Sequence, residues 1–273
     1  MTSERHVIWF DEPDALSVEI AGGKGASLAS MTAQGLPVPP GFVIPSDLME
    51  KCVDAEALRA LARAKDHVGA MRLVEETAKV DPSVLEAYAK LGGKVAVRSS
   101  ASAEDSEAAS YAGQQETYLN VTGAEDVRRH VIDCWASFFS ERAIFYRNLK
   151  GSLEDLRMAV VVQKMVDAEK AGVIFTVHPV TKRRDRMLIE AVHGLGEQVV
   201  SGEVTPDHYV VDRKGVKKKE DTPHGGVLTD EELEKLAVLA VTLEKHYGVP
   251  QDIEWAMHGG NVYLLQSRPV TTL

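Results

Sequence analysis

The stretch from Met158 to Met165 constrains the fold of this chain most, because it reads Met-Ala-Val-Val-Val-Gln-Lys-Met. A run that is almost continuously apolar and β-branched is typical of a β-strand whose two faces are both buried. We therefore expect this stretch to form a strand in the interior of the protein.

Periodicity and chain-breaking residues predict the other elements. Helices are expected at about Lys24 to Gln34, with Gly35 as the left-handed residue after its end, within residues 55–90, at about Glu125 to Leu149, and from the Thr229–Glu232 capping box to about Tyr247. Alternation predicts strands at residues 94–99, 172–176, 187–192, 208–212, 252–258 and 262–267. The basic runs 182–184 and 217–219 are expected to be solvated turns.

Composition narrows the class of protein. With 273 residues, 44% hydrophobic and 26% charged, the chain has the composition of an ordinary globular protein of one large or two small domains. The formal net charge of -10 argues against a nucleic-acid partner. Cys52 and Cys134 lack metal-ligand spacing, so we expect both to be buried small hydrophobes in a reducing compartment. No signal peptide or long apolar run occurs, which predicts a cytoplasmic protein without membrane association.

The segment Gly22-Gly23-Lys24-Gly25 brings a lysine close to bare backbone where the first helix begins. Free N–H groups and the helix dipole favour a phosphate group at such a place. The segment is not a Walker A loop, which has four residues between its glycines and a Ser or Thr after the lysine. On these residues alone, a structural turn is the simpler interpretation.

Arg98 lies at the end of the strand predicted over residues 94–99. Arginine suits phosphate oxygens because its planar group can donate two parallel hydrogen bonds. The loop that follows contains Gly113, Gln114 and Thr117, whose backbone, amide and hydroxyl groups could fold over a polyphosphate. An ordinary surface loop explains these residues equally well.

The last two predicted strands form a hairpin, and each of them carries polar residues on one face. A three-residue loop over residues 259–261 would set Glu254 opposite Gln266 and Asp252 opposite Arg268, whereas an even-numbered loop would break this match. The oxygens of Glu254 and Gln266 would then converge on a hard divalent cation such as Mg²⁺. A surface hairpin with an ion pair is the alternative, but Gln266 interrupts an apolar run.

The end of the most apolar predicted strand, from Gln163 to Val166, offers another kind of contact. Open backbone groups at a strand end can bind an adenine edge, while Met165 packs against the ring face. Taken alone, this feature is weak.

The order of these motifs resembles the nucleotide-binding domain of the family that contains phosphoenolpyruvate synthase, pyruvate phosphate dikinase and rifampin phosphotransferase. The resemblance runs almost from end to end of the chain. The segments that carry it follow one another in the family's order: GGKGASL (22–28) with GLPVPPGF (35–42), VRSSA (97–101), GQQETYLNV (113–121), VQKMV (162–166), GVIFT (172–176), DIEWA (252–256) and LQSRP (265–269).

The resemblance implies an α+β, ATP-grasp-like fold whose two lobes, residues 1–164 and 165–273, hold MgATP in a cleft between them. Position by position, it implies that Lys24 and Arg98 hold the β and γ phosphates and that Arg268 adds charge at the transferring group. Glu254 and Gln266 would ligate Mg²⁺, with Asp252 nearby. The adenine pocket would be lined by Gln163, Met165 and Val166, and the loop over the phosphates would contain Gly113, Gln114 and Thr117. We also expect Lys24, Arg98 and Glu254 to face solvent in an open cleft. His178 stands where relatives commonly carry Asp or Asn, and we expect it to be structural.

The family's reaction implies partners. In this reaction a histidine on a swivelling domain attacks the β phosphate of ATP and takes a pyrophosphoryl group, which leaves AMP. Water or phosphate then removes the γ phosphate, and the remaining phosphohistidine phosphorylates pyruvate or another acceptor at a third domain. None of the nine histidines here lies in the Gly- and Thr-flanked motif that holds this histidine in the family. The histidine-bearing and acceptor-binding domains are therefore expected on another polypeptide, as in split relatives that phosphorylate phenol, or on a missing remainder of the chain. A non-catalytic ATP-sensing module and a self-contained ATP-grasp ligase stay open as alternatives.

Overall fold

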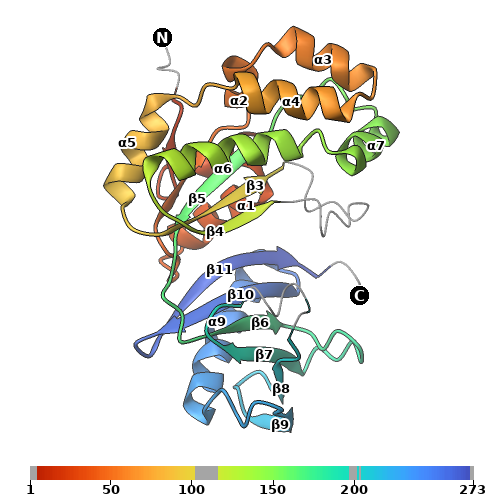
Figure 1. Cartoon of the computed structure of the whole chain (residues 1–273). Coiled ribbons are helices and arrows are strands. Elements are labelled where there is room, and N and C mark those ends of the chain that lie inside the picture. Colours follow the sequence, from red (N-terminus) through yellow and green to blue (C-terminus); the bar gives the residue numbers. More distant parts are fainter. Residues whose placement is uncertain (1–4, 102–115, 197–201, 203, 271–273) are drawn as a thin grey trace. The chain divides into compact units, whose positions relative to one another are not determined.

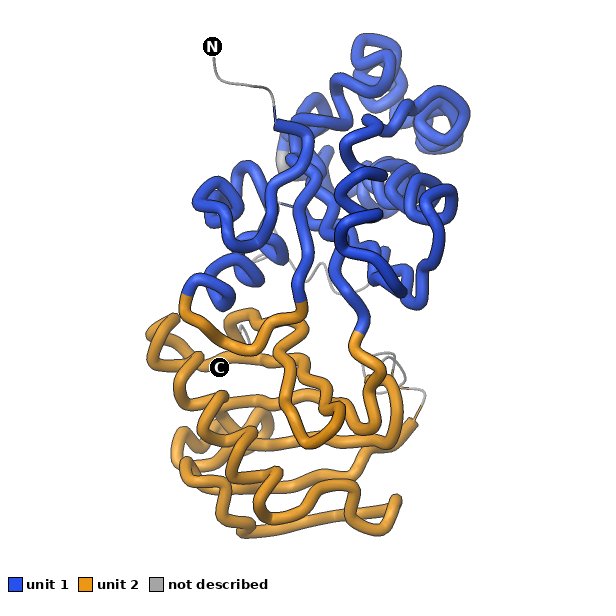
Figure 2. Tube along the Cα trace, turned by 90° about the vertical axis from the view of Figure 1, so that its left-hand side faces the viewer, with its two compact units in different colours: residues 1–33, 40–165 blue, residues 34–39, 166–273 orange. Residues whose placement is uncertain are grey.

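The computed structural model describes residues 5–101, 116–196, 202 and 204–270. Contacts divide the chain into two compact units, each of which combines helices with an antiparallel sheet (Figure 1). Unit 1 comprises Met1–Ala33 and Pro40–Met165, and unit 2 comprises Gln34–Pro39 and Val166–Leu273 (Figure 2). The expected α+β class is confirmed.

The sheet of unit 1 has five strands in the order β1-β2-β5-β3-β4, and every neighbouring pair is antiparallel. The strands are β1 (Ile8–Trp9), β2 (Gly41–Ile44), β3 (Val95–Ser100), β4 (Thr117–Val121) and β5 (Ala159–Lys164). The apolar strand β5 lies between β2 and β3 and is buried from Ala159 to Gln163. The prediction of a strand buried on both faces is therefore confirmed.

Helices α1 (Val18–Ala33) and α6 (Ala124–Ser137) cover the two faces of this sheet. On the α1 face, a Cβ added to Gly25 would approach Val43 to 3.0 Å and Val161 to 3.6 Å. On the other face, Val97 and Val162 belong to one apolar cluster with the α6 residues, Trp135 among them. The alternation of β3 and β5 therefore sends every second side chain to each helix.

The remaining helices of unit 1 are η1 (Pro13–Leu16), α2 (Leu48–Cys52), α3 (Ala55–Arg63), α4 (His67–Thr77), α5 (Pro82–Leu91) and α7 (Glu141–Lys150). The prediction of one helix from Glu125 to Leu149 is wrong, because the chain leaves α6 after Ser137 and begins α7 at a new cap, where the Ser140 hydroxyl accepts from the Ala143 N–H at 3.4 Å. Of the two cysteines, Cys134 is fully buried and Cys52 is half-buried, and both pack in this core.

The sheet of unit 2 has six antiparallel strands in the order β11-β10-β6-β7-β8-β9. They are β6 (Lys170–Phe175), β7 (Met187–His193), β8 (Asp207–Val211), β9 (Lys217–Asp221), β10 (Gln251–His258) and β11 (Asn261–Pro269). The basic run of residues 217–219 begins the fully exposed edge strand β9, so its assignment to a turn is wrong. Charged side chains, lysine above all, protect such an edge from pairing with another chain.

Helix α9 (Asp230–Tyr247) supplies the apolar cover of unit 2. Its Thr229–Glu232 capping box is present, as predicted. Leu236 of α9, Ile174 of β6 and Trp255 of β10 are all fully buried. Among the described helices, none is both long enough and apolar enough to cross a membrane.

Candidate functional site

The glycine-rich turn of unit 1 is hydrogen-bonded to the end of strand β3. Gly22 interrupts the helical geometry of α1 with a φ of 69°. The Gly23 N–H donates to the Ala101 carbonyl at 3.0 Å, and the Gly25 N–H donates to the Ser100 hydroxyl at 3.2 Å. A Cβ at Gly22 would lie 2.2 Å from the Ser100 carbonyl oxygen, so only glycine fits there.

Lys24 is hydrogen-bonded to the residue that follows Arg98 in this arrangement. The Lys24 ammonium donates to the carbonyl oxygen of Ser99 at 3.1 Å, one residue beyond Arg98. Arg98 pairs with Val161 across β3 and β5, and Val161 is on the α1 face of the sheet, so Arg98 shares that face. Each of the two cations is only 7% exposed, and the expectation that they face solvent is wrong. The close approach of α1 to the sheet accounts for their burial.

The other nucleotide-binding candidates of unit 1 lie on neighbouring strands. Gln163 pairs with Ala96 of β3 and with Gly41 of β2, shares the face of Arg98, and is 3% exposed. Met165 is half-buried and donates its N–H to the Lys94 carbonyl at 2.9 Å. Val166, the first residue of unit 2 after this strand, is also half-buried.

The predicted phosphate loop is described only at its end. Thr117 is exposed at the first position of β4, where it pairs with Arg98. Gly113 and Gln114 lie outside the described residues.

The hairpin of unit 2 has the predicted cross-strand pairs but not the predicted loop. Glu254 lies opposite Gln266 and Asp252 opposite Arg268. The loop has two residues, because His258 pairs with Asn261, and a bulge between Glu254 and Trp255 in the register restores the match. The three-residue loop is therefore wrong, while the pairing that it was invoked to explain is confirmed.

Charged side chains lie close together on the polar face of this hairpin. The Arg268 guanidinium donates to Asp252 through Nε and Nη2, each at 2.8 Å from Oδ2. Burial raises the pKa of Asp252 even though Arg268 opposes the shift, and the Glu254 carboxylate raises it further. Burial also raises the pKa of Glu190, whose Oε1 lies 3.3 Å from His208 Nδ1, and Asp252 adds to that rise. Asp252 and Glu190 therefore hold protons more tightly than free side chains do.

Glu190 and His208 are the residues of this face that sequence reasoning did not assign. The register runs from Gln266 through Glu254, Val173 and Glu190 to His208, so these side chains form one row across five strands. Whether a residue belongs to this row depends on how distant strands pair, and the local sequence gives no signal for that pairing. Glu190 lies in the strand predicted over residues 187–192, and that pattern indicated a strand but no site.

Whether the hairpin suits a metal ion depends on the Glu254–Gln266 pair. In the described part of the chain, no group of three or more His, Cys, Asp or Glu side chains is arranged to hold a metal ion. Mg²⁺ does not require such a cage, because it commonly binds one or two carboxylates together with substrate phosphates. A carboxylate facing an amide across a strand pair fits that mode of binding.

His178 acts as an acceptor in a turn after β6. Its Nδ1 lies 3.3 Å from the backbone nitrogens of Val180 and Thr181, both of which donate to it. An Asp or Asn side chain makes this kind of contact in ordinary turns. The contact supports the structural role expected for His178.

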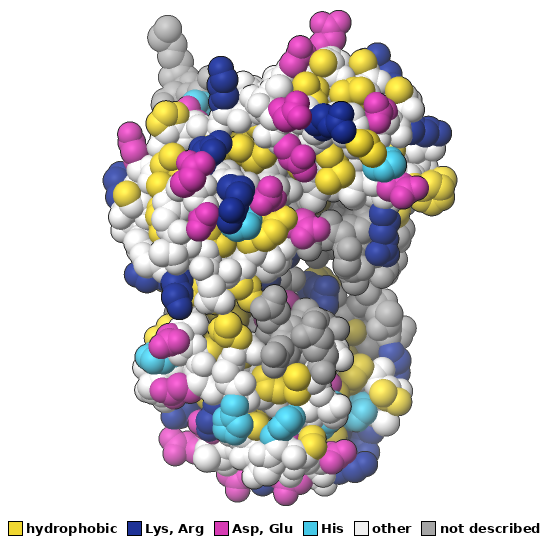
Figure 3. All heavy atoms as spheres, viewed as in Figure 1, with side chains coloured by type: hydrophobic (Ala, Val, Ile, Leu, Met, Phe, Trp, Pro, Cys, Tyr) yellow, Lys and Arg dark blue, Asp and Glu magenta, His cyan; other side chains and the backbone are white. Residues whose placement is uncertain are grey.

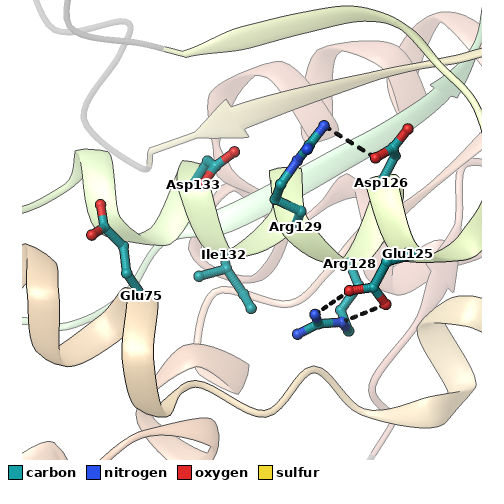
Figure 4. A pocket seen from close by; sticks show the side chains of 7 residues that line it. All are labelled: Glu75, Glu125, Asp126, Arg128, Arg129, Ile132 and Asp133. Carbon is teal, nitrogen blue, oxygen red and sulfur yellow. Dashed lines mark hydrogen bonds and ion pairs between the residues drawn. The ribbon is translucent and has the colours of Figure 1, made fainter.

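The surface hollow between α4 and α6, about 220 Å³ in volume, contains none of the predicted site residues (Figure 4). Its rim is charged, and Arg128 pairs with Glu125 while Arg129 pairs with Asp126 at 3.1 Å. On the face drawn in Figure 3, acidic and basic side chains are likewise interspersed over the helices of unit 1. These pairs are typical of a solvated helix surface.

Comparisons with the sequences of known proteins agree on one family. The protein family described as pyruvate phosphate dikinase, AMP/ATP-binding domain, matches residues 18–223 and 214–273. The chain is 42% identical to a probable phosphoenolpyruvate synthase of Methanocaldococcus jannaschii, in an alignment that covers 99% of this chain and 27% of that protein. It is 44% identical to the Archaeoglobus fulgidus protein of the same description, covering 98% of this chain and 42% of that protein.

A phosphoenolpyruvate synthase of Pyrococcus furiosus is 37% identical, over 98% of this chain and 44% of that protein. The chain thus spans less than half the length of these three relatives. A solved structure, D-alanyl-alanine synthetase A from Vibrio cholerae, aligns over 94% of this chain at 12% identity with a TM-score of 0.41.

The first alignment is 323 positions long against 273 residues here, so the relative carries residues within the matched region that this chain lacks. The two matched segments of the family overlap at residues 214–223, the stretch that contains β9. The match nevertheless extends from residue 18 to residue 273, and the chain belongs to the pyruvate phosphate dikinase AMP/ATP-binding domain family.

Proposed function

We propose that this chain is the ATP-binding component of a dikinase-type phosphotransferase. It binds MgATP and presents the β phosphate to a histidine on a separate domain or subunit, which then phosphorylates pyruvate, a phenol-like compound or another acceptor. In this proposal, residues 1–164 and 165–273 are the two lobes of an ATP-grasp fold. Membership of an AMP/ATP-binding family supports the nucleotide, and the relatives' description supports the class of reaction.

The observation that carries the proposal is the pair of cations at the glycine-rich turn. Lys24 and Arg98 are both 7% exposed, and the Lys24 ammonium contacts the residue that follows Arg98. Lysine and arginine are the side chains that donate to phosphate oxygens, and at this turn both lie where the backbone of α1 meets the end of β3. Because Gly22 has no side chain, the turn can lie directly against Ser100, and this contact places Lys24 beside the end of β3.

The polar face of the hairpin supports the metal. Glu254 and Gln266 would ligate Mg²⁺, while Arg268, held by Asp252, would add positive charge at the transferring phosphoryl group. The bound metal ion would neutralise phosphate charge. Gln163, Met165 and Val166 would line the adenine pocket, and Gly113, Gln114 and Thr117 would belong to the loop over the phosphates.

This set of residues meets the demands of phosphoryl transfer. The reaction needs positioned cations more than covalent chemistry from the protein, because charge on the phosphoryl oxygens must be neutralised. The covalent acceptor would be the partner's histidine. The relatives extend well beyond the matched region, which leaves room for histidine-bearing and acceptor-binding domains.

Phosphorus NMR of the chain with MgATP tests the proposal, first alone and then with the segment of the Archaeoglobus fulgidus relative that lies outside the match. We expect shifted ATP resonances without turnover, followed by AMP once that segment is added. ADP from the chain alone would point to a ligase or an ordinary kinase instead. Binding without AMP in the reconstituted system would point to a sensing module. Unshifted resonances in both samples would overturn ATP binding itself.

An Arg98→Ala variant tests the residue assignment in the same reconstituted system. We expect AMP formation to be abolished, while an Arg142→Ala variant on the exposed side of α7 keeps wild-type activity. Full activity of Arg98→Ala would contradict the assigned role.

A further inference from the structure

The register of the β10–β11 hairpin changes along its length. Next to the two-residue loop, Met257 pairs with Val262 and Trp255 pairs with Leu264. Continued without a bulge, this register would set Leu265 opposite Glu254. The observed partner of Glu254 is Gln266, so Leu265 is the extra residue of a bulge on β11.

The bulge decides which face of the sheet carries the site residues. Because side chains alternate along a strand, a shift of one residue moves a whole set to the opposite face. Without the bulge, Gln266 would lie opposite Ile253, which points to the buried α9 side of the sheet. Gln266 and Arg268 reach the face of Glu254 and Asp252 only in the bulged register.

A buried polar contact lies at the open end of the hairpin, just beyond the site residues. The Ser267 hydroxyl donates to Gln251 Oε1 at 2.8 Å, and the two residues are 4% and 1% exposed. The Gln251 amide donates in turn to the carbonyls of Val249 at 3.0 Å and Pro250 at 3.3 Å. Both Gln251 and Ser267 are direct chain neighbours of the Asp252–Arg268 pair.

This contact continues to Thr176, the residue that follows strand β6. The Gln251 N–H donates to the Thr176 hydroxyl at 2.8 Å, and the Thr176 N–H donates to the Gln251 carbonyl at 2.9 Å. The Thr176 carbonyl accepts from Arg213 at 2.7 Å, and Arg213 pairs with Glu244 of α9 at 2.9 Å. Gln251 is therefore fixed independently of β11, and Ser267 is the group that must come to it.

We propose that Gln251 and Ser267 are positioning residues, whose buried hydrogen bond selects the bulged register and so holds Gln266 and Arg268 beside Glu254 and Asp252. In the unbulged register, Ser267 lies opposite Asp252, on the face away from Gln251, and the bond cannot form. A buried polar pair adds little net stability over an apolar pair, but a buried polar group left without its partner is costly, so the pair discriminates between registers. The functional part of this inference rests on the proposed function.

Two variants of the full chain test the inference, Gln251→Met and Ser267→Ala. The first readout is register, measured by NMR as proton contacts between Glu254 and Gln266 against contacts between Glu254 and Leu265. We expect both variants to populate the unbulged contacts, which the wild type lacks. Ser267→Thr keeps the hydroxyl and should keep the wild-type register.

The second readout is the Mg²⁺ dependence of ATP binding, measured by calorimetry at fixed ATP. Supporting groups behind metal ligands typically change metal affinity about 10- to 100-fold, and we expect a loss in this range for both variants. Binding of ATP in EDTA should be unchanged. Leu243→Ala, in the fully buried face of α9, is the matched control, because it lowers stability without altering a hairpin residue and should keep wild-type Mg²⁺ dependence.

The outcomes separate the two proposals. A wild-type register in both Gln251→Met and Ser267→Ala would overturn the inference, whatever happens to metal binding. An altered register with unchanged Mg²⁺ dependence would overturn its functional part. Glu254→Ala addresses the proposed function by itself, since unchanged Mg²⁺ dependence in that variant would remove the metal site and leave the register result standing.

Discussion

The ammonium group of Lys24 and the carbonyl oxygen of Ser99 form a 3.1 Å hydrogen bond between residues 75 positions apart. This bond joins the start of the regular part of α1 to the end of β3, at the residue that follows Arg98. The turn that presents Lys24 is therefore defined by tertiary contacts, and its geometry depends on residues of both elements.

Gly22→Ala should damage this turn severely. The new Cβ would lie 2.2 Å from the Ser100 carbonyl oxygen and would also occupy a φ of +69°. Gly35→Ala is the matched control for backbone strain alone, because Gly35 has a φ of +70° and a Cβ there would meet no described atom within 4 Å beyond its chain neighbours. We expect about 1–2 kcal/mol of destabilisation for Gly35→Ala and clearly more for Gly22→Ala in urea unfolding. Equal losses would show that the contact with Ser100 is unimportant.

Lys24→Met should separate stability from binding. Removal of a charge that is 7% exposed relieves its desolvation, while methionine keeps most of the volume. We expect the free energy of unfolding without nucleotide to stay within about 1 kcal/mol of wild type. The rise in melting temperature on addition of MgATP should disappear. Lys235→Met, at an exposed position of α9, should keep that rise. A full MgATP-dependent rise in Lys24→Met would contradict the proposed phosphate contact.

Asp207 should make stability depend on pH in the acid range. Burial alone would raise the pKa of Asp207, but the N–H groups of His224, Val227 and Gly226 outweigh it and hold the pKa below its usual range. Asp207→Asn should therefore cost about 1–3 kcal/mol at neutral pH.

Since the folded pKa of Asp207 is depressed, the stabilisation is present above the unfolded value of about 3.9 and is lost as pH falls through the folded value. The difference between wild type and Asp207→Asn in urea unfolding should therefore shrink as the pH is lowered below about 4. A difference that is constant over this range would contradict the assignment.

His178 should tolerate only side chains that accept hydrogen bonds. Asparagine can receive the N–H groups of Val180 and Thr181 that His178 Nδ1 receives, whereas alanine cannot. We expect His178→Asn to stay within about 0.5 kcal/mol of wild type and His178→Ala to lose about 1 kcal/mol. Faster hydrogen exchange at the Thr181 amide in the alanine variant would identify the lost contact. Equal exchange in both variants would argue against it.

Local patterns predicted the elements whose cause is local. The apolar run of β5 and the Thr229–Glu232 capping box carry their own signals, and the structure contains both. The break between α6 and α7 was missed because the apolar stripe continues through it. At this break the Arg147 guanidinium lies 3.9 Å over the Phe138 ring and donates to the carbonyls of Phe138 and Leu153. The connection between the two helices is therefore held by contacts of a side chain from α7.

In the candidate site, too, local patterns predicted residue types but not features that depend on tertiary contacts. Lys24 and Arg98 could be singled out by residue type, but their burial depends on how closely α1 approaches the sheet. The Glu254–Gln266 pair was predicted with a loop of the wrong length, because a bulge at Leu265 cannot be read from hairpin spacing alone. Glu190 joins this face only through the pairing of β6 with β7.

The short segment Gln34–Pro39 gives the protein an order of assembly. It belongs to unit 2, although α1 and β2 on either side of it belong to unit 1, and its Pro37 carbonyl accepts from the N–H of Leu264 at 2.8 Å. During synthesis from the N-terminus, Pro37 leaves the ribosome long before β11 does. Unit 1 can fold around this segment first, whereas unit 2 can complete its sheet edge only after β11 has been made.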